Sequence, residues 1–304
     1  MQLGFALPTS GSWAHRENMA ALARRADELG YASLWTFQRL LYPPDAGWAP
    51  VYRSVHDPLI TLAYVAGLTR RARLGTAIVN APFYSPVVLA KQLTSLDEVT
   101  HGRLDAGLGL GWSQEEFAAA GVGYERRGAR LEEFVQCLRT IWTDEVVEFD
   151  GEFYRVPRAR VDPKPVQRPH PPLLFGGTAA PALRRAGRMA AGWISSSRAD
   201  LSGLATSISV VRDAAAEAGR DPSGLRFVVR GVVRVRPAGA SDQPPLTGPI
   251  GKIRDDLAQI ARLGATELFV DLNFDPEIGS PDADPADSLR RAHEVLEALA
   301  PAGG

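Results

Sequence analysis

The feature that most constrains the fold of this chain is a repeated alternation of short apolar segments with longer amphipathic ones. Apolar segments such as 3–7, 33–37 and 72–79 predict buried strands, and each is followed by apolar residues at helical spacing. We count roughly eight strand–helix units, the number that closes a parallel barrel. An open doubly wound sheet is the alternative, but such a sheet seldom reaches this length without a second domain.

The sequence predicts one domain over residues 1–304. A chain of 304 residues that is 45% hydrophobic can bury a full core, and (β/α)8 TIM barrels of this size are commonly single domains. A segment of about residues 143–171 interrupts the alternation of strands and helices between predicted strands four and five. There, residues 146–156 predict a β-hairpin that turns at Asp150 and Gly151, and a proline-rich segment predicts an extended connector. The tail 300–304 is expected to fray.

The glycine-rich segment 102–117 predicts a strand that runs into a sharp turn and then into a helix. Glycines recur at every second position from Gly107 to Gly111, so on a strand they share one face. A glycine face lets a flat or bulky group approach the backbone closely. Ser113 followed by Glu116 is a capping-box pattern that predicts the start of the helix. The segment indicates either the mouth of a cofactor site or a tight connection without a ligand.

A second candidate turn follows the next predicted strand. Gly176 and Gly177 end that strand, and Thr178 leads into a helix. Free N–H groups and the positive end of the helix dipole favour an anion in such a turn. We therefore favour a phosphate site over a short loop that uses glycine only for its backbone freedom. The C-terminal strand ends of a barrel carry its chemistry, so both turns should lie at one end.

Composition and motifs disfavour several classes of function. A net charge of −1, with 34 basic and 35 acidic residues, argues against a nucleic-acid or anionic-membrane surface. Five histidines lack metal-ligand spacing, so no metal site is predicted. Adjacent carboxylates such as Glu115 and Glu116 are interpreted as helix caps and solvated faces. No apolar run reaches the ~18 residues that span a bilayer, and the strand predicted at Leu3 leaves no room for a signal peptide. A cytoplasmic protein is expected.

With these segments placed, the chain resembles the luciferase-like monooxygenase superfamily over nearly its whole length. Within it, the chain is most similar to the actinobacterial deazaflavin-dependent (coenzyme F420) oxidoreductases. The motifs that carry the resemblance are residues 101–112, Glu116 and Phe117, 127–133, 141–142, 149–154, 163–167, 175–177 and 191–193. These motifs are specific for the superfamily, and they separate F420 from FMN members much less sharply.

The resemblance implies a flat tricyclic cofactor, F420 or alternatively FMN, in the C-terminal mouth of the barrel. The residues implied to bind it are Phe175, Gly176, Gly177 and Thr178 on one side, and Gly109, Gly111 and Trp112 on the other. Family members often carry a non-prolyl cis peptide at the end of strand three. The matching positions here are Ala77 and Ile78.

One departure from the family pattern bears on the reaction. Many F420 enzymes have an acidic residue and a histidine at the end of strand two, where this chain has Gln38 and Arg39. Gln38 cannot act as a base and Arg39 is permanently protonated, which disfavours alcohol oxidation. Arg39 or Tyr42 is instead the predicted catalytic donor or electrostatic clamp for hydride delivery to a C=C or C=N bond. The alternative is that Arg39 only pairs with a carboxylate at the barrel rim.

We therefore predict an F420-dependent oxidoreductase, acting as a reductase, that moves a hydride between the deazaflavin C5 and a small organic substrate. The alternatives are an FMN-dependent two-component monooxygenase and a non-catalytic flavin- or deazaflavin-binding protein. The family is often dimeric, so a homodimer is expected. The residues expected to wall the substrate pocket are Tyr42, Trp48, Tyr52, Phe83 and Tyr84.

Overall fold

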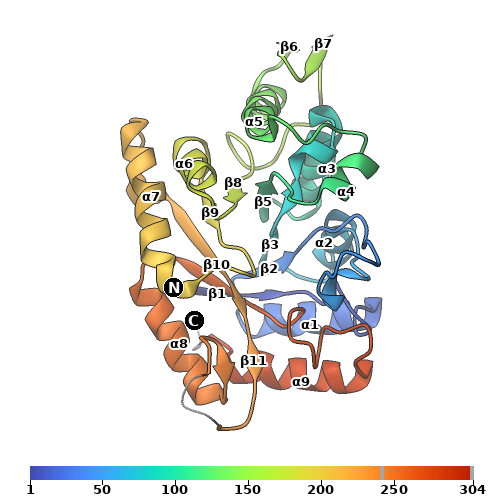
Figure 1. Cartoon of the computed structure of the whole chain (residues 1–304). Helices are drawn as coiled ribbons and strands as arrows, with labels where there is room; N and C mark the ends of the chain where they lie inside the picture. Colours follow the sequence, from blue (N-terminus) through green and yellow to red (C-terminus); the bar gives the residue numbers. More distant parts are fainter. Residues whose placement is uncertain (240–242, 302–304) are drawn as a thin grey trace.

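Eight parallel strands close into a barrel in the computed structural model, which describes residues 1–239 and 243–301, and helices surround them (Figure 1). In pairing order, the barrel strands are β1 (Gln2–Ala6), β2 (Ser33–Thr36), β3 (Arg73–Thr76), β5 (Leu104–Gly109), β8 (Leu173–Gly176), β9 (Gly192–Ile194), β10 (Arg226–Val232) and β13 (Glu267–Asp271). β13 pairs with β1 and closes the ring, so the predicted (β/α)8 barrel is confirmed. Most of the predicted tail, residues 302–304, lies outside the described residues.

The helices follow the strands in the expected alternation. They are α1 (Arg16–Glu28), α2 (Pro58–Ala66), α3 (Pro86–Val99), α4 (Gln114–Ala119), α5 (Arg127–Thr143), α6 (Ala180–Met189), α7 (Leu204–Glu217), α8 (Ile250–Arg262) and α9 (Pro285–Ala298). Short elements between them are η1 (Pro50–Tyr52), η2 (Ala81–Phe83), η3 (Leu201–Gly203), η4 (Pro222–Gly224), β4 (Val79–Asn80), β11 (Arg234–Val235) and β12 (Thr247–Gly248). Local caps set several helix starts, as when the Ser113 hydroxyl accepts the Glu116 N–H at 3.1 Å.

A separate two-stranded antiparallel sheet, β6 (Val147–Asp150) and β7 (Arg155–Ala159), lies between β5 and β8 in the chain and projects away from the barrel (Figure 1). The predicted turn at Asp150 and Gly151 is too short. Asp150 pairs with Arg155, so the loop comprises residues 151–154. Glu133 of α5 explains the longer loop, because its carboxylate accepts three consecutive backbone N–H groups, those of residues 152–154.

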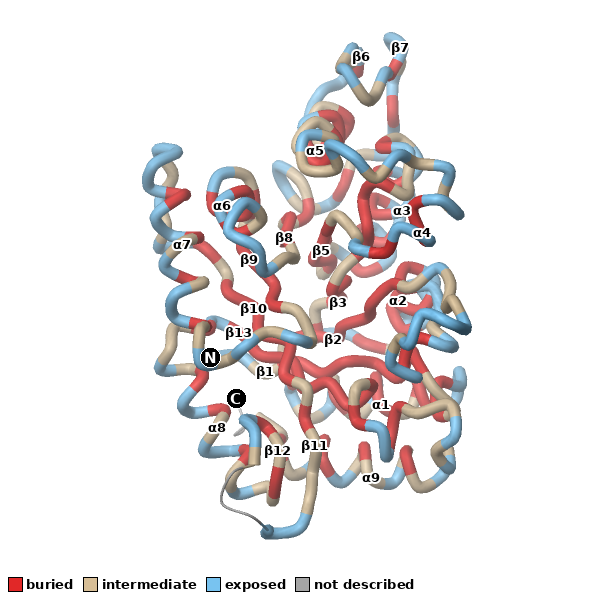
Figure 2. Tube along the Cα trace, in the orientation of Figure 1, coloured by how far each residue is buried: buried red, intermediate tan, exposed pale blue. Residues whose placement is uncertain are grey.

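The inside of the barrel is a packed core, as the buried strands in Figure 2 indicate. Trp35 and Phe269 stack across it with ring centroids 5.2 Å apart and an interplanar angle of 21°. Gly75 lies against this stack, and a Cβ there would overlap the Trp35 ring. Leu174 and Val228 belong to the same cluster. The stack therefore gives the barrel a floor below its C-terminal end.

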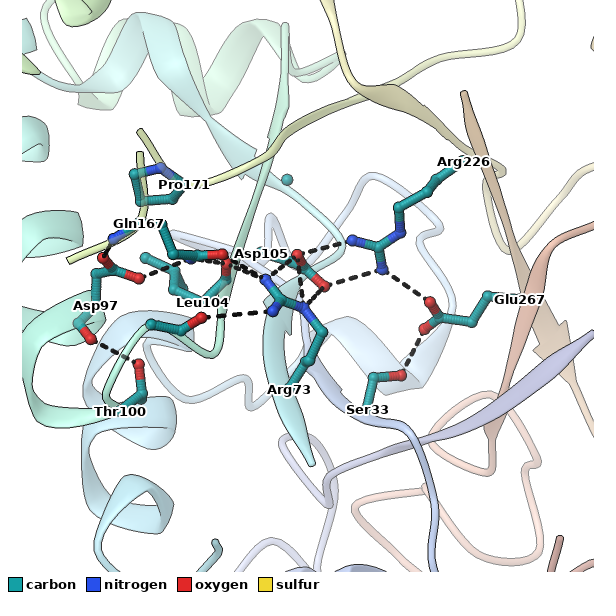
Figure 3. A network of polar contacts seen from close by, with 12 residues as sticks. Ser33, Arg73, Asp97, Thr100, Leu104, Asp105, Gln167, Pro171, Arg226 and Glu267 are labelled. Carbon is teal, nitrogen blue, oxygen red and sulfur yellow. Dashed lines mark hydrogen bonds and ion pairs between the residues drawn. The ribbon is translucent and has the colours of Figure 1, made fainter. Parts of the chain in front are cut away.

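Charged side chains close the N-terminal end of the barrel (Figure 3). Asp105 is fully buried, and its Oδ1 lies 2.7 Å from Nη2 of Arg73 and 2.8 Å from Nη1 of Arg226. Arg226 also donates to Glu267 at 2.8 Å. Burial alone would raise the pKa of Asp105, but the two guanidinium groups outweigh it and hold that pKa below its usual range. Asp105 is therefore a buried carboxylate that stays ionised.

Candidate functional site

A cavity of about 540 Å³ opens at the C-terminal ends of the barrel strands. Strand ends and the loops that follow them supply its walls, as expected for this fold. The predicted site residues that line it are Gln38, Arg39, Ala77, Ile78, Gly109, Gly111, Trp112, Gly176, Gly177 and Thr178. The turns after β5 and β8 thus face one space, because these strands are neighbours in the barrel.

Two of the predicted site residues do not line this cavity. Phe175 is 1% exposed and lies in the core between strands and helices, because its neighbour on β8, Leu174, takes the inward-facing position. The Tyr42 hydroxyl donates to the Trp48 carbonyl at 3.1 Å, and the Tyr42 ring packs edge-on against the Trp48 ring. Both residues therefore support the site from behind instead of facing it.

The glycines of β5 face inward, as their spacing predicts, and part of the space they leave is filled by the protein itself. The peptide between Ala77 and Ile78 is cis, as the resemblance implied. The Ile78 side chain lies against Gly109 and Gly176. A Cβ at Gly109 would overlap it, and one at Gly176 would lie 3.0 Å from its Cγ2. Ile78 therefore forms a ridge in the cavity between the two glycine turns.

The turn after β8 presents unused hydrogen-bond donors. Gly177 has a φ of +134°, and its carbonyl accepts the Trp193 indole N–H at 2.7 Å, which holds the turn in place. α6 begins just after Ala179, whose side chain provides no cap. The N–H groups of Thr178 and Ala179 meet no acceptor within residues 1–239 and 243–301. These donors, at a helix N-terminus, suit a phosphate oxygen.

Arginines add positive charge to the same cavity. Arg127 and Arg198 both line it, and neither forms an ion pair with any other described residue. The Arg198 guanidinium carbon lies 5.7 Å from the centre of the Trp112 ring, and that of Arg127 lies 4.0 Å from the Tyr124 ring centre. The predicted phosphate turn therefore shares its cavity with cations that have no counter-ion in the described chain.

Arg39 occupies a box of aromatic rings and carries its own counter-ion. Its guanidinium carbon lies 4.7 Å from the ring centre of Trp112 and 5.3 Å from that of Tyr52. Nη1 lies 3.2 Å from Oε2 of Glu116, which is fully buried. Glu116 was predicted to be a cap or a solvated side chain. Its capping position at the helix start is confirmed, because its N–H donates to Ser113. The solvated side chain is wrong, because the carboxylate is buried against Arg39. Burial lowers the pKa of Arg39 while Glu116 opposes the change, and the guanidinium stays protonated.

Arg230 of β10 is a lining residue that the sequence analysis missed. Its Nε donates to Asp271 Oδ2 at 2.6 Å, and its Nη1 donates to the Ala77 carbonyl at 3.3 Å. Its guanidinium also lies over the rings of Phe37 and Phe274 at 4.7 and 4.5 Å. The sequence did contain a signal for this residue, namely an arginine within an otherwise apolar strand. A buried arginine needs a partner, so a polar or charged neighbour could have been expected.

Gln38 has a fixed amide and offers no base. Its Oε1 accepts the Asn80 N–H at 2.8 Å, and its Nε2 donates to the Tyr84 hydroxyl at 2.6 Å. Burial raises the pKa of Tyr84, so this phenol stays protonated. The side-chain oxygen of Asn80, a lining residue, is buried without a donor in the described chain. A bound molecule with an N–H or O–H group would satisfy it.

The aromatic wall differs in part from its prediction. Tyr52 lines the cavity, whereas Trp48 packs behind Trp112 and Phe83 packs on Phe117. The rings that face the cavity are Phe37, Tyr52, Trp112 and Phe274.

The described residues contain neither a membrane-spanning helix nor a group of metal-binding side chains. No helix within 1–239 or 243–301 combines the length and the apolar character that a bilayer crossing requires. Over the same ranges, no three side chains of His, Cys, Asp or Glu are grouped so that they could hold a metal ion.

Comparisons with known proteins agree with this geometry. The sequence profile of the luciferase-like monooxygenases matches residues 1–242. An uncharacterized protein of Mycobacterium tuberculosis (strain ATCC 25618 / H37Rv) is 31% identical over 293 residues, which cover 92% of this chain and 93% of that protein. The FMNH(2)-dependent dimethylsulfone monooxygenase of Pseudomonas putida is 32% identical over 54% of this chain and 46% of its own length. The structure of an F420-dependent secondary alcohol dehydrogenase superposes with a TM-score of 0.78 at 18% identity, over 98% of both chains.

Proposed function

Because the chain belongs to the luciferase-like monooxygenase family, we propose that it is an F420-dependent reductase of small organic molecules. Members and structural neighbours of this family use either F420 or FMN, and the chain is a flavin- or deazaflavin-type oxidoreductase in that broader sense. The observation that carries the narrower proposal is the charge of the cavity. Four arginines line it, Arg39, Arg127, Arg198 and Arg230, against one carboxylate among the described lining residues, Asp200.

The residues present fit such a cofactor. The N–H groups of Thr178 and Ala179, with Gly177, would hold its phosphate at the start of α6. Ile78 would support the centre of the flat ring from below, since it forms the ridge between Gly109 and Gly176. The buried oxygen of Asn80 would accept a donor from the ring edge or the side chain of the cofactor. When bound in its reduced form, F420 supplies a hydride from ring carbon C5.

The chain's own residues favour hydride delivery over proton removal. Addition of a hydride to an activated C=C or C=N bond leaves negative charge on the substrate, and the Arg39 guanidinium would stabilise that charge. The aromatic rings around Arg39 exclude water and so strengthen this interaction. Among the described lining residues, Gln38 is an amide and the Asp200 carboxylate accepts the Ser202 N–H at 2.9 Å, so neither is placed as a base.

Cofactor titration followed by anaerobic turnover tests the proposal. The full-length protein would be titrated with F420 and with FMN, each oxidised and reduced, and binding followed by cofactor fluorescence. Protein loaded with reduced F420 would then be mixed, without oxygen, with a panel of cyclic enones and imines. Reoxidation of F420 by one substrate class supports the reductase. Binding of neither cofactor contradicts the proposal.

A second candidate is an FMN-dependent monooxygenase that receives reduced FMN from a separate reductase. The likeness to the dimethylsulfone monooxygenase supports it. The same experiment separates the two, because the monooxygenase would bind FMN more tightly and would need oxygen for turnover. Binding without turnover in either atmosphere would indicate a protein that only carries the cofactor. We also propose a homodimer, which light scattering during gel filtration would test.

A further inference from the structure

A second cavity adjoins the first one on the side of β10 and β13. It has a volume of about 270 Å³ and lies between η1, the loop after β9, β11 and the loop after β13. Four residues line both cavities, and they are Tyr52, Ser197, Arg198 and Phe274. The two spaces are thus neighbours that share a wall.

The polar lining of this second cavity is cationic. Arg198 and Arg234 both line it, and none of its described lining residues is an aspartate or a glutamate. The acidic residues closest in sequence already have partners. Asp275 lies 2.6 Å from Arg236, and Asp271 lies 2.6 Å from Arg230. The described lining of the second cavity therefore contains two arginines and no carboxylate.

Arg234 has an unused donor there. Its Nη2 makes a long hydrogen bond of 3.4 Å to the Phe274 carbonyl, and its Nε is buried without an acceptor among residues 1–239 and 243–301. Leaving a donor of a charged group buried and unpaired is unfavourable, so such groups usually have a partner. The guanidinium fork matches the two oxygens of a carboxylate or a phosphate.

We propose that the second cavity binds a terminal oxyanion of the substrate, a carboxylate or a phosphate, through Arg198 and Arg234. This proposal rests on the proposed function and narrows its substrate class. The unsaturated, apolar part of the substrate lies among Phe37, Tyr52 and Phe274 in the first cavity, and its anionic end lies in the second. Arg198 lies between the two spaces, so it orients the molecule with respect to the reacting bond.

Matched pairs of ligands test the oxyanion. The full-length protein, saturated with the cofactor it binds, would be titrated with cinnamate and cinnamamide, with 4-phenylbutanoate and its amide, and with 3-phenylpropyl phosphate and its alcohol. Calorimetry would give each dissociation constant. The anion of a pair should bind about tenfold or more tightly than its neutral partner. Preference for the carboxylates or for the phosphate identifies the oxyanion. Equal binding within every pair, or no binding of any probe, overturns the proposal.

Substitutions locate the effect. Arg234→Gln should abolish the preference for the anion, and Arg234→Lys should restore it in part for the phosphate, since lysine keeps the charge and loses the fork. Arg198→Gln provides a second route if the Arg234 variants do not fold. Arg53→Gln is the control, because Arg53 is half-exposed in the same region, pairs with Asp282 and lines neither cavity. A preference that survives both the Arg234 and the Arg198 substitutions overturns the assignment.

The cofactor titrations keep the two proposals apart. If Arg234→Gln binds F420 or FMN like the parent protein but loses the anion preference, the oxyanion belongs to the substrate. If the variant instead loses cofactor affinity and keeps the preference, the subsite proposal is wrong and the proposed function stands. If the parent protein binds neither cofactor yet still prefers the anionic probes through Arg234, the proposed function is wrong and the subsite stands.

Discussion

Arg39 and Glu116 form an ion pair at the mouth of the barrel that is closed off from solvent, with side-chain exposures of 8% and 0%. The second oxygen of Glu116 accepts the backbone N–H of Leu40 at 2.7 Å, so one carboxylate holds both the charge of Arg39 and the loop that carries it. Loss of the carboxylate leaves a buried cation without a counter-ion, which costs more than the pair contributes.

Glu116→Gln should therefore destabilise the protein by about 3–5 kcal/mol, because it removes the counter-ion of Arg39. Glutamine can still accept the hydrogen bond from Leu40, so the variant isolates the effect of the charge. The midpoint of urea denaturation at neutral pH measures the change. Glu115→Gln is the matched control, because Glu115 is the exposed neighbour on the same helix and contacts only the Ser113 hydroxyl, so the midpoint should change far less. Equal midpoints for the two variants would show that the pair does not stabilise the rim.

Gly177→Ala should weaken cofactor binding at least tenfold while the barrel stays folded. A Cβ at Gly177 would lie 2.6 Å from the Cβ of Ala182, and the φ of +134° disfavours any side chain. The turn would shift and its free N–H groups would no longer converge. Gly219→Ala is the control for backbone strain alone, since Gly219 has a φ of +71°, faces open space and lies far from the cavity in the fold. Fluorescence titration of both variants with F420 and FMN gives the dissociation constants to compare.

The contact between Gly109 and Ile78 predicts a compensating pair of substitutions. Gly109→Ala places a methyl group where the Ile78 side chain lies and should cost about 1–3 kcal/mol of stability. Ile78→Ala vacates that space, so the double variant should be more stable than the sum of the single effects predicts. Ile60→Ala on the exposed face of α2 serves as the uncoupled partner. Additivity of Gly109→Ala and Ile78→Ala would contradict the ridge described here.

The buried Asp105 predicts a pH dependence of stability. Its pKa is lower in the folded protein than in the unfolded chain, so its contribution is fully present above the unfolded value of about 3.9 and is lost as the pH falls through the folded value. Asp105→Asn should be less stable than the parent by about 3–5 kcal/mol at pH 7, and the difference should shrink below about pH 4. Urea midpoints between neutral and acidic pH test this. Asp45→Asn, an exposed loop variant, should show no such difference.

Local rules explain which parts of the fold could be predicted. The cap at Ser113, the glycine-facing side of β5 and the turn at Gly177 each depend on a few neighbouring residues, and each was predicted from them. The prediction of a hairpin turn at Asp150 and Gly151 was wrong because Glu133, a residue of the preceding helix, accepts the backbone N–H groups of the loop and stabilises a longer one. The local preference of an Asp–Gly pair was overridden by a contact between two elements.

Pairs that join distant strands could not be predicted in the same way. Arg230 pairs with Asp271, which lies 41 positions later, because β10 and β13 are neighbours in a particular register. Glu116 carries a correct capping signal for its helix and still has a second role that depends on where the loop of Arg39 ends. Both pairs follow from barrel closure, and the sequence contains only their charges.

The Trp35–Phe269 stack fills the barrel interior below the cavity. A molecule that reaches the cavity must enter and depart through the C-terminal opening. A planar ring bound deepest in this opening would be covered by any molecule that binds after it. The molecule that binds second would therefore have to dissociate before the first could be exchanged.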